Sequence, residues 1–234
     1  MIKLLIKTGI LFVLVLIFPF LLNAEDFSLS KYPNNPVFNE GNGWDSGFVT
    51  MPSVTFTGSQ YFMAFSAYSN SHWKIGIATS TDGINWNRYN NNPVINRENL
   101  ENPDAHNPSI LYNGSSFEMW YTSSQGGGSN NFKIQRATST DGFTWTTDPP
   151  QPVLIPNQSW DVQGISNPFV LKVGTTYKMW YSAQSGGVWK IGLATSSNGI
   201  SWISNPSNPI ISSDSLWEYG QLVSPTVTYD GSIY

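Results

Sequence analysis

Short apolar runs with strand-like composition, separated by turn residues, fill most of the chain. Runs such as SVTF, FEMWYTS and WKIGIATS are rich in β-branched and aromatic residues, which favour strands. Asn113-Gly114 and Asp230-Gly231 are dipeptides typical of tight hairpins, because both residues of such a turn accept a positive φ. Helical periodicity is absent after residue 24. The pattern therefore predicts an all-β fold of antiparallel strands.

These runs recur in a fixed order with a period of 56 to 60 residues. The first run of each unit follows a proline, at Pro52, Pro108, Pro168 and Pro225. The third run ends in a Ser-x-Asp/Asn-Gly turn and then a tryptophan, at Trp86, Trp145 and Trp202. A four-stranded sheet repeated at such a period cannot bury its own faces, so successive sheets pack as the blades of a propeller. We expect three blades and the first strand of a fourth, which leaves the propeller incomplete at the C-terminus.

The N-terminus has the organisation of a secretory signal peptide. Lys3 and Lys7 precede an apolar run over residues 10–22, and Ala24 marks a cleavage site. The run is short for a membrane span, which needs about 20 apolar residues, although retention as an uncleaved anchor stays open. We expect residues 1–24 to be removed and residues 25–234 to form one domain that is secreted, periplasmic or on the cell surface, without membrane contact.

Composition narrows the classes of partner. The chain has 11 basic and 15 acidic side chains and a net charge of −4, so it lacks the basic footprint of a nucleic-acid-binding protein. It has no cysteine, so an exported fold must be stable without disulfides. Its ten tryptophans suit the core between packed sheets. They also suit sugar binding, because pyranose faces pack on aromatic rings.

An acidic residue lies seven positions before each strand-opening proline. These residues are Asp45, Glu101, Asp161 and Glu218. Catalysis needs unlike groups at one place, whereas these are like groups spread around a ring. We therefore expect structural roles for them, such as capping backbone N–H groups.

Residues just before the prolines should converge on a central funnel, because the innermost strand of each blade starts there. The candidates for substrate binding are Thr50, His106, Asn107, Gln163, Asn167, Gln221 and Ser224. Asp104 and His106 have no equivalents in the other repeats, and Glu118 on a second run is matched by Phe62 and Lys178. Asp104 and Glu118 are thus the candidate catalytic carboxyl groups. The alternative is a polar axial channel filled with water.

The repeat resembles a known group of propellers. A proline-opened strand, a Y-x-M-W-Y strand, K-I-G-x-A-T-S-x-D-G-x-x-W and N-P-V/I together resemble the five-bladed propellers of the arabinanase, invertase and levansucrase type, which include glycoside hydrolase families 43, 32 and 130. The resemblance spans residues 34–234. The S-T-D-G-x-x-W turn is also similar to the Asp-box of sialidase-like propellers, but is one residue shorter.

The resemblance implies a poly- or oligosaccharide ligand, and glycosidic bond hydrolysis by carboxyl groups near the axis. It implies no cofactor, apart from the Ca²⁺ that some arabinanase-like relatives hold at the axis, which here would lie near His106. Two histidines without cysteine give no transition-metal constellation.

The sequence departs from the family where its acids would stand. In the family pattern these acids lie at or just before the strand-opening proline; here the positions hold Met51, Asn107 and Ser166-Asn167. Asparagine cannot act as a proton acceptor at neutral pH. Two functions therefore remain open: a glycoside hydrolase, or a non-catalytic carbohydrate-binding or structural propeller.

Overall fold

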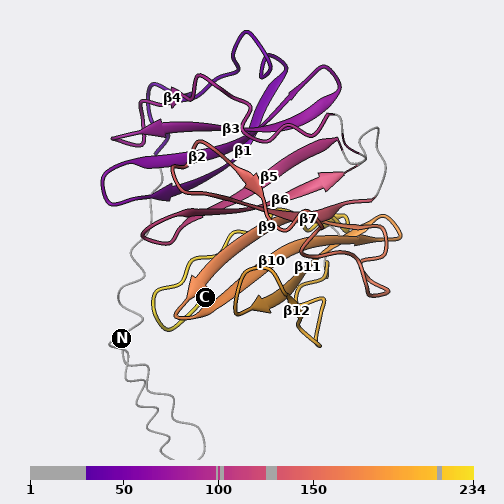
Figure 1. The fold of residues 1–234 in the computed structure, drawn as a ribbon. Helices are drawn as coiled ribbons and strands as arrows, with labels where there is room; N and C mark the ends of the chain where they lie inside the picture. Colours follow the sequence, from indigo (N-terminus) through magenta and orange to yellow (C-terminus); the bar gives the residue numbers. More distant parts are fainter. Residues whose placement is uncertain (1–29, 99, 101–102, 125–130, 215–217) are drawn as a thin grey trace, which may run out of the picture. The chain divides into compact units, whose positions relative to one another are not determined.

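The computed structural model describes residues 30–98, 100, 103–124, 131–214 and 218–234. The chain divides into two compact units, residues 1–35 and residues 36–234, and all the described strands lie in the second unit (Figure 1). The expected signal peptide falls outside the described residues. Within the described part, no helix has the length and apolar composition of a membrane span.

Three four-stranded antiparallel sheets make up the second unit, each with its strands in sequence order. Figure 1 shows the sheets following one another from the indigo end of the chain to the orange end. The strands are β1 (Phe48–Phe56), β2 (Tyr61–Ser69), β3 (His72–Ser80), β4 (Asn87–Arg88), β5 (Asp104–Tyr112), β6 (Phe117–Ser124), β7 (Lys133–Ser139), β8 (Thr146–Thr147), β9 (Gly164–Val173), β10 (Thr176–Ser185), β11 (Val188–Ser196) and β12 (Ile203–Ser204). The predicted all-β blades are confirmed, and the described sheets do not close a ring.

The fourth strand of each sheet is shorter than the sequence pattern suggests. β4, β8 and β12 have two residues each, and the chain returns to the sheet only at isolated bridges such as Ile75 to Ile95. The side chain of Asn92 explains the gap in the first sheet. Its Oδ1 accepts from the Ile77 N–H at 2.9 Å and its Nδ2 donates to the Ile77 carbonyl at 2.8 Å, so a side-chain amide replaces the main-chain ladder.

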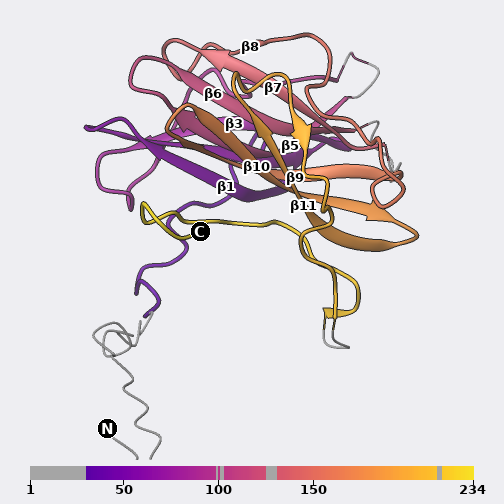
Figure 2. The same cartoon turned by 90° about the horizontal axis from the view of Figure 1, so that it is seen from below.

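The expected first strand of a fourth blade is extended but forms no ladder. Residues 222–230 run toward the C-terminus without a strand in Figure 2. The Ser224 N–H still donates to Ser182 Oγ on β10 at 3.0 Å. The segment is thus attached to the third sheet, but no described second strand pairs with it.

Two of the buried clusters in the described residues lie between neighbouring sheets, and a third packs Phe65 of the first sheet against Phe38 and Trp44. One buried cluster joins the first and second sheets and includes Ile75, Ala105 and Met119. Another joins the second and third sheets and includes Trp120 and Met179. Each sheet thus buries one face against the next, as the repeat predicts.

The repeated acids that precede the prolines have structural partners. Asp161 accepts the N–H groups of Asn157 and Gln158 at 3.0 and 2.7 Å. Glu218 accepts a backbone N–H at 2.9 Å, and buried Asp45 pairs with Arg88 at 2.8 Å. Glu101 lies outside the described residues.

The Ser-x-Asp/Asn-Gly turns have the same hydrogen bonds from backbone N–H groups and from the tryptophan in all three sheets. In the first, Asp82 Oδ1 accepts the N–H groups of Ile84 and Asn85, both at 2.8 Å. The Trp86 indole N–H donates to the Gly83 carbonyl at 3.1 Å. In the second and third turns, Asp141 and Asn198 take the place of Asp82. Each accepts the N–H groups of the second and third residues that follow it.

These turns predict an acid-sensitive contribution to stability. Backbone hydrogen bonds, led by that from Thr144, lower the pKa of Asp141 from 3.8 to about 2, and those led by Asn85 lower the pKa of Asp82. A carboxyl group whose pKa is lower in the folded state than in the unfolded state stabilises the fold above pH 3.8. This contribution is lost as the pH falls through the pKa of the folded state.

The double variant Asp82→Asn/Asp141→Asn should therefore lose less stability between pH 4 and pH 2.5 than the parent, because Asn198 accepts the same two backbone N–H groups without titrating. Urea unfolding at a series of pH values measures this. Glu40→Gln, which removes an exposed carboxylate elsewhere, is the control. An unchanged acid dependence in the double variant would contradict the prediction.

Candidate functional site

The prediction that a proline opens each first strand is wrong, because β1, β5 and β9 each begin four residues before their proline. The residue just before each of the four prolines has a left-handed backbone. Met51, Asn107, Asn167 and Ser224 have φ values of 52°, 53°, 52° and 58°. The pairing register shifts at this point in β1, β5 and β9, which marks a β-bulge in each first strand. Such bulges redirect side chains near functional sites. Asparagine accepts this conformation better than methionine does.

Hydrogen bonds between sheets hold these bulges in line. The Asn107 N–H donates to Ser66 Oγ on β2 at 2.8 Å, and the Asn167 N–H donates to Thr122 Oγ1 on β6 at 3.1 Å. The bond from Ser224 to β10 is the equivalent at the third sheet. One cavity of about 310 Å³ is lined by Pro52, Pro108, Pro168 and Pro225. The predicted convergence of the first strands is therefore confirmed.

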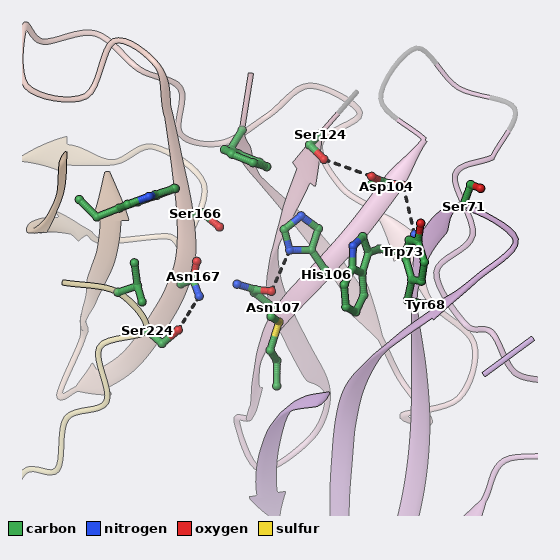
Figure 3. A pocket seen from close by; sticks show the side chains of 14 residues that line it. Tyr68, Ser71, Trp73, Asp104, His106, Asn107, Ser124, Ser166, Asn167 and Ser224 are labelled. Carbon is green, nitrogen blue, oxygen red and sulfur yellow. Dashed lines mark hydrogen bonds between the residues drawn. The ribbon is translucent and has the colours of Figure 1, made fainter. Parts of the chain in front are cut away.

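A larger pocket of about 580 Å³ opens above these bulges (Figure 3). All three sheets and the segment after the third sheet contribute to it. Its lining residues are Met51, Tyr68, Ser71, Trp73, Asp104, His106, Asn107, Ser124, Phe132, Ser166, Asn167, Trp189, Val223 and Ser224.

The structure brings most of the predicted site residues to this pocket. Asp104, His106, Asn107, Asn167 and Ser224 line it together, and Asn167 Nδ2 donates to Ser224 Oγ at 2.6 Å.

Three of the residues predicted to bind substrate do not line the pocket. Thr50 pairs with Ser66 in the β1–β2 ladder. Gln163 Oε1 accepts the Gly187 N–H at 3.2 Å, and Gln221 Nε2 donates to the Gly187 carbonyl at 3.3 Å. Both glutamines thus bind the turn of the β10–β11 hairpin. Neither lines the pocket in which we expected them to contact a ligand.

Glu118 is the predicted residue whose position does not fit its expected role. It lies at the opposite end of β6 from the pocket, paired with Leu111, and is buried. Its Oε2 accepts from Arg136 Nη2 at 2.8 Å, and its Oε1 accepts from the Tyr177 hydroxyl at 2.8 Å. The carboxyl group therefore joins the second and third sheets. The break in the repeat at residue 118 therefore coincides with an ion pair inside the second sheet and a hydrogen bond to the third sheet, at a distance from the pocket.

Asp104, which lines the pocket, accepts hydrogen bonds from three groups. Its Oδ1 lies 3.2 Å from His72 Nδ1 and 3.1 Å from the Trp73 backbone nitrogen. Its Oδ2 lies 3.5 Å from Ser124 Oγ. Only 4% of Asp104 is exposed, so its carboxyl group is engaged within the protein.

His106 lies beside the left-handed Asn107, with its Nδ1 2.8 Å from Asn107 Oδ1 (Figure 3). Burial lowers the pKa of His106 below its ordinary value, while the bond to Asn107 and the charge of Asp104 act in the opposite direction. The ring is therefore neutral at pH 7 and donates from Nδ1 to the amide oxygen.

Aromatic rings form a continuous strip along the pocket, which we call the aromatic strip. It consists of Trp73, His106, Phe132 and Trp189, with neighbouring ring centroids 5.9, 6.1 and 6.1 Å apart. Tyr68 extends it at the Trp73 end, at 5.1 Å.

Sequence reasoning missed these pocket aromatics, although a signal was present. An aromatic residue stands immediately before the lysine of every third run, in WKIG, FKIQ and WKIG. In an antiparallel meander the third strand starts at the same end as the first strand, so these rings belong beside the strand-opening prolines.

The described lining does not fit a calcium ion. Ca²⁺ takes six to eight oxygen ligands, usually with several carboxylates, whereas the only carboxyl group in this lining is that of Asp104, which is already engaged. Nowhere in the described residues do three or more His, Cys, Asp or Glu side chains form a cluster. The lining also contains neither lysine nor arginine.

Comparison with known proteins places the chain among carbohydrate-processing propellers. A family model described as β-1,4-mannooligosaccharide phosphorylase, glycoside hydrolase family 130, matches residues 94–216. The uncharacterized protein Rv1502 of Mycobacterium tuberculosis is 26% identical over 181 residues, which cover 73% of this chain and 60% of that protein. The chain thus spans about 60% of the length of the curated relatives it matches.

Solved structures show the same fold. A thermostable family-43 glycoside hydrolase has a TM-score of 0.60 at 25% identity, covering 73% of this chain and 58% of its own. Zg3597, a family 117 glycoside hydrolase of Zobellia galactanivorans, has a TM-score of 0.62 at 15% identity, covering 74% and 60%. A member of the mannoside phosphorylase family, reported with glycoside hydrolases that target β-1,2 mannosidic linkages in Candida mannan, has a TM-score of 0.54 at 18% identity, covering 75% and 57%.

Proposed function

Because the chain belongs to the β-1,4-mannooligosaccharide phosphorylase family, glycoside hydrolase family 130, we propose that it is a carbohydrate-active protein that binds a poly- or oligosaccharide in the pocket of Figure 3. The aromatic strip carries this proposal. The C–H faces of sugar rings pack on Trp and Phe, and the amides and hydroxyls beside the strip match sugar hydroxyls.

Cleavage of a glycosidic bond is the activity that the family suggests. In enzymes with two carboxyl groups, the groups flank the bond about 6.5–9.5 Å apart when the product is inverted. The described lining offers one carboxyl group, that of Asp104, and holds Met51, Asn107 and Ser166 near the prolines. This observation favours a second candidate, a propeller that binds carbohydrate without turnover.

We also propose that the protein is exported, on the basis of residues 1–24. N-terminal sequencing of the exported protein should give Glu25 as its first residue. A retained N-terminus would contradict cleavage.

Calorimetric titration with β-1,4- and β-1,2-mannooligosaccharides tests the binding site. Trp73→Ala and Trp189→Ala should each weaken binding about tenfold, since each removes one stacking surface. Tyr219→Ala is the control, because Tyr219 is 85% exposed and lies outside the pocket. Equal affinities for the parent and both Trp variants would contradict the site.

Turnover separates the two candidate functions. Sugar release is measured with and without inorganic phosphate, at concentrations where calorimetry shows the sugar bound. Release that needs phosphate identifies a phosphorylase, and release without phosphate identifies a hydrolase. Binding without release supports the non-catalytic propeller.

A further inference from the structure

We propose that Asp104 is a positioning residue, whose carboxyl group fastens the β2–β3 hairpin to the second sheet and so holds Trp73 in the aromatic strip. The proposal rests on the proposed function only where it concerns sugar binding. The fastening itself is a property of the fold and can be measured without a ligand.

The hairpin that carries Trp73 is a tight turn at the rim of the pocket. Asn70 and Ser71, which connect β2 to β3, both have positive φ values, 52° and 67°. The next two residues bind Asp104: His72 through its ring nitrogen and Trp73 through its backbone N–H. These bonds cross from the first sheet to the second.

The equivalent junctions of the other sheets use the main chain instead. At the second junction, Phe132 forms a parallel bridge with Gly164, and the Ile165 N–H donates to the Phe132 carbonyl at 3.0 Å. At the third junction, the Trp189 N–H donates to the Gly220 carbonyl at 2.8 Å. In both cases an aromatic residue of the strip is fixed by backbone pairing with the following segment.

The first junction has no such backbone bridge among the described residues. Asp104 stands four positions before its proline, as do Gly164 and Gln221 before theirs. The Trp73 N–H donates to the side-chain oxygen of Asp104 at 3.1 Å, whereas the equivalent Trp189 N–H donates to the main-chain carbonyl of Gly220. The carboxyl group thus replaces a main-chain acceptor, which explains why an acidic residue occurs in this repeat alone.

Positioning requires residue 104 to accept hydrogen bonds, whereas acid catalysis requires it to release a proton. In all three contacts the oxygens of Asp104 accept hydrogen bonds. Asparagine keeps an oxygen for the Trp73 N–H but cannot donate a proton as an acid does. Alanine keeps neither property. A positioning residue therefore tolerates asparagine and not alanine, whereas a catalytic acid tolerates neither.

Amide hydrogen exchange of the full chain tests the fastening directly. Asp104→Ala should speed exchange of the Trp73 amide about tenfold or more, because a hydrogen bond to a charged group is lost. Asp104→Asn should leave it within about threefold of the parent, since the acceptor oxygen is kept. The Trp189 amide is the internal control and should not change in either variant, because its acceptor is a main-chain carbonyl.

The second readout is affinity for a β-1,4-mannooligosaccharide, and sugar release where the parent shows it. Asp104→Asn should keep both and Asp104→Ala should weaken affinity. An unchanged Trp73 exchange rate in Asp104→Ala would overturn the proposal, as would loss of affinity or sugar release in an Asp104→Asn variant with a protected Trp73 amide. If Asp104→Ala does not fold, the Asn variant alone decides between these outcomes. Failure of the parent to bind any sugar removes the proposed function and leaves the exchange result standing.

Discussion

Replacing Glu118 with alanine is expected to lower the free energy of unfolding by about 3–5 kcal/mol, the cost of breaking a buried ion pair by removing one partner. Arg136 would lose its 2.8 Å bond to the carboxylate while staying buried, and its Nε already lacks a partner in the described structure. The Tyr177 hydroxyl would lose its acceptor as well. Urea unfolding measures the change.

A matched control stands at the same register position of the next sheet. Lys178 on β10 is the equivalent of Glu118, and its ammonium group lies over the Tyr234 ring at 4.0 Å. Lys178→Ala should therefore cost about 0.5–1 kcal/mol, as expected for an exposed cation–π contact. Glu118→Gln, which keeps the shape, should leave sugar binding unchanged. Near-parent stability of Glu118→Ala together with lost turnover would instead restore a catalytic role for this residue.

Replacing Trp120 with alanine should cost about 3–5 kcal/mol, the range for truncating a large buried aromatic side chain. Trp120 is 0% exposed and lies between the second and third sheets. Its indole N–H donates to the Gly199 carbonyl at 2.8 Å, and its ring meets Trp202 edge-on at 6.1 Å. The variant would leave a cavity at this junction, and the Gly199 carbonyl would keep only the indole N–H of Trp202, at 3.2 Å, of its two indole donors.

Trp180→Ala provides the comparison for Trp120. Trp180 holds the equivalent position on β10, and it packs beside Tyr234 near the C-terminus rather than between two described sheets. We expect a smaller loss of stability for it in the same urea experiment. Equal losses for the two variants would contradict the view that the junction between sheets is what Trp120 stabilises.

The strands could be predicted because each carries its own signals. A Ser-x-Asp/Asn-Gly turn closes every third strand, so local chemistry marks that end. A proline marks every first strand but not its start, because β1, β5 and β9 each begin four residues before the proline. The fourth strand was harder to predict. Asn92 replaces main-chain pairing with its side chain, and a strand-like composition does not reveal such a substitution.

Site residues could be predicted from the sequence only where their place along a strand was enough to bring them to the pocket. Asp104, His106 and Asn107 reach the pocket because β5 starts there. The catalytic prediction for Glu118 relied on a break in the repeat, and the position of Glu118 away from the pocket lends it no support. Arg136 breaks the repeat of the third runs in the same unit, and two such breaks together indicate an ion pair.

Two features of the pocket needed coordinates. The left-handed backbone of Met51 is not expected from its residue type, since positive φ is uncommon outside glycine and asparagine. The joining of Trp73, His106 and Phe132 into one strip depends on the angle between neighbouring sheets, which residue spacing does not give.

A crystal structure of the protein with a bound β-1,4-mannooligosaccharide tests the central claim most directly. The account predicts sugar rings lying against Trp73, Phe132 and Trp189, with their hydroxyls bonded to Asn107 and Asn167. A sugar bound at another surface, with the aromatic strip left uncovered, would contradict it.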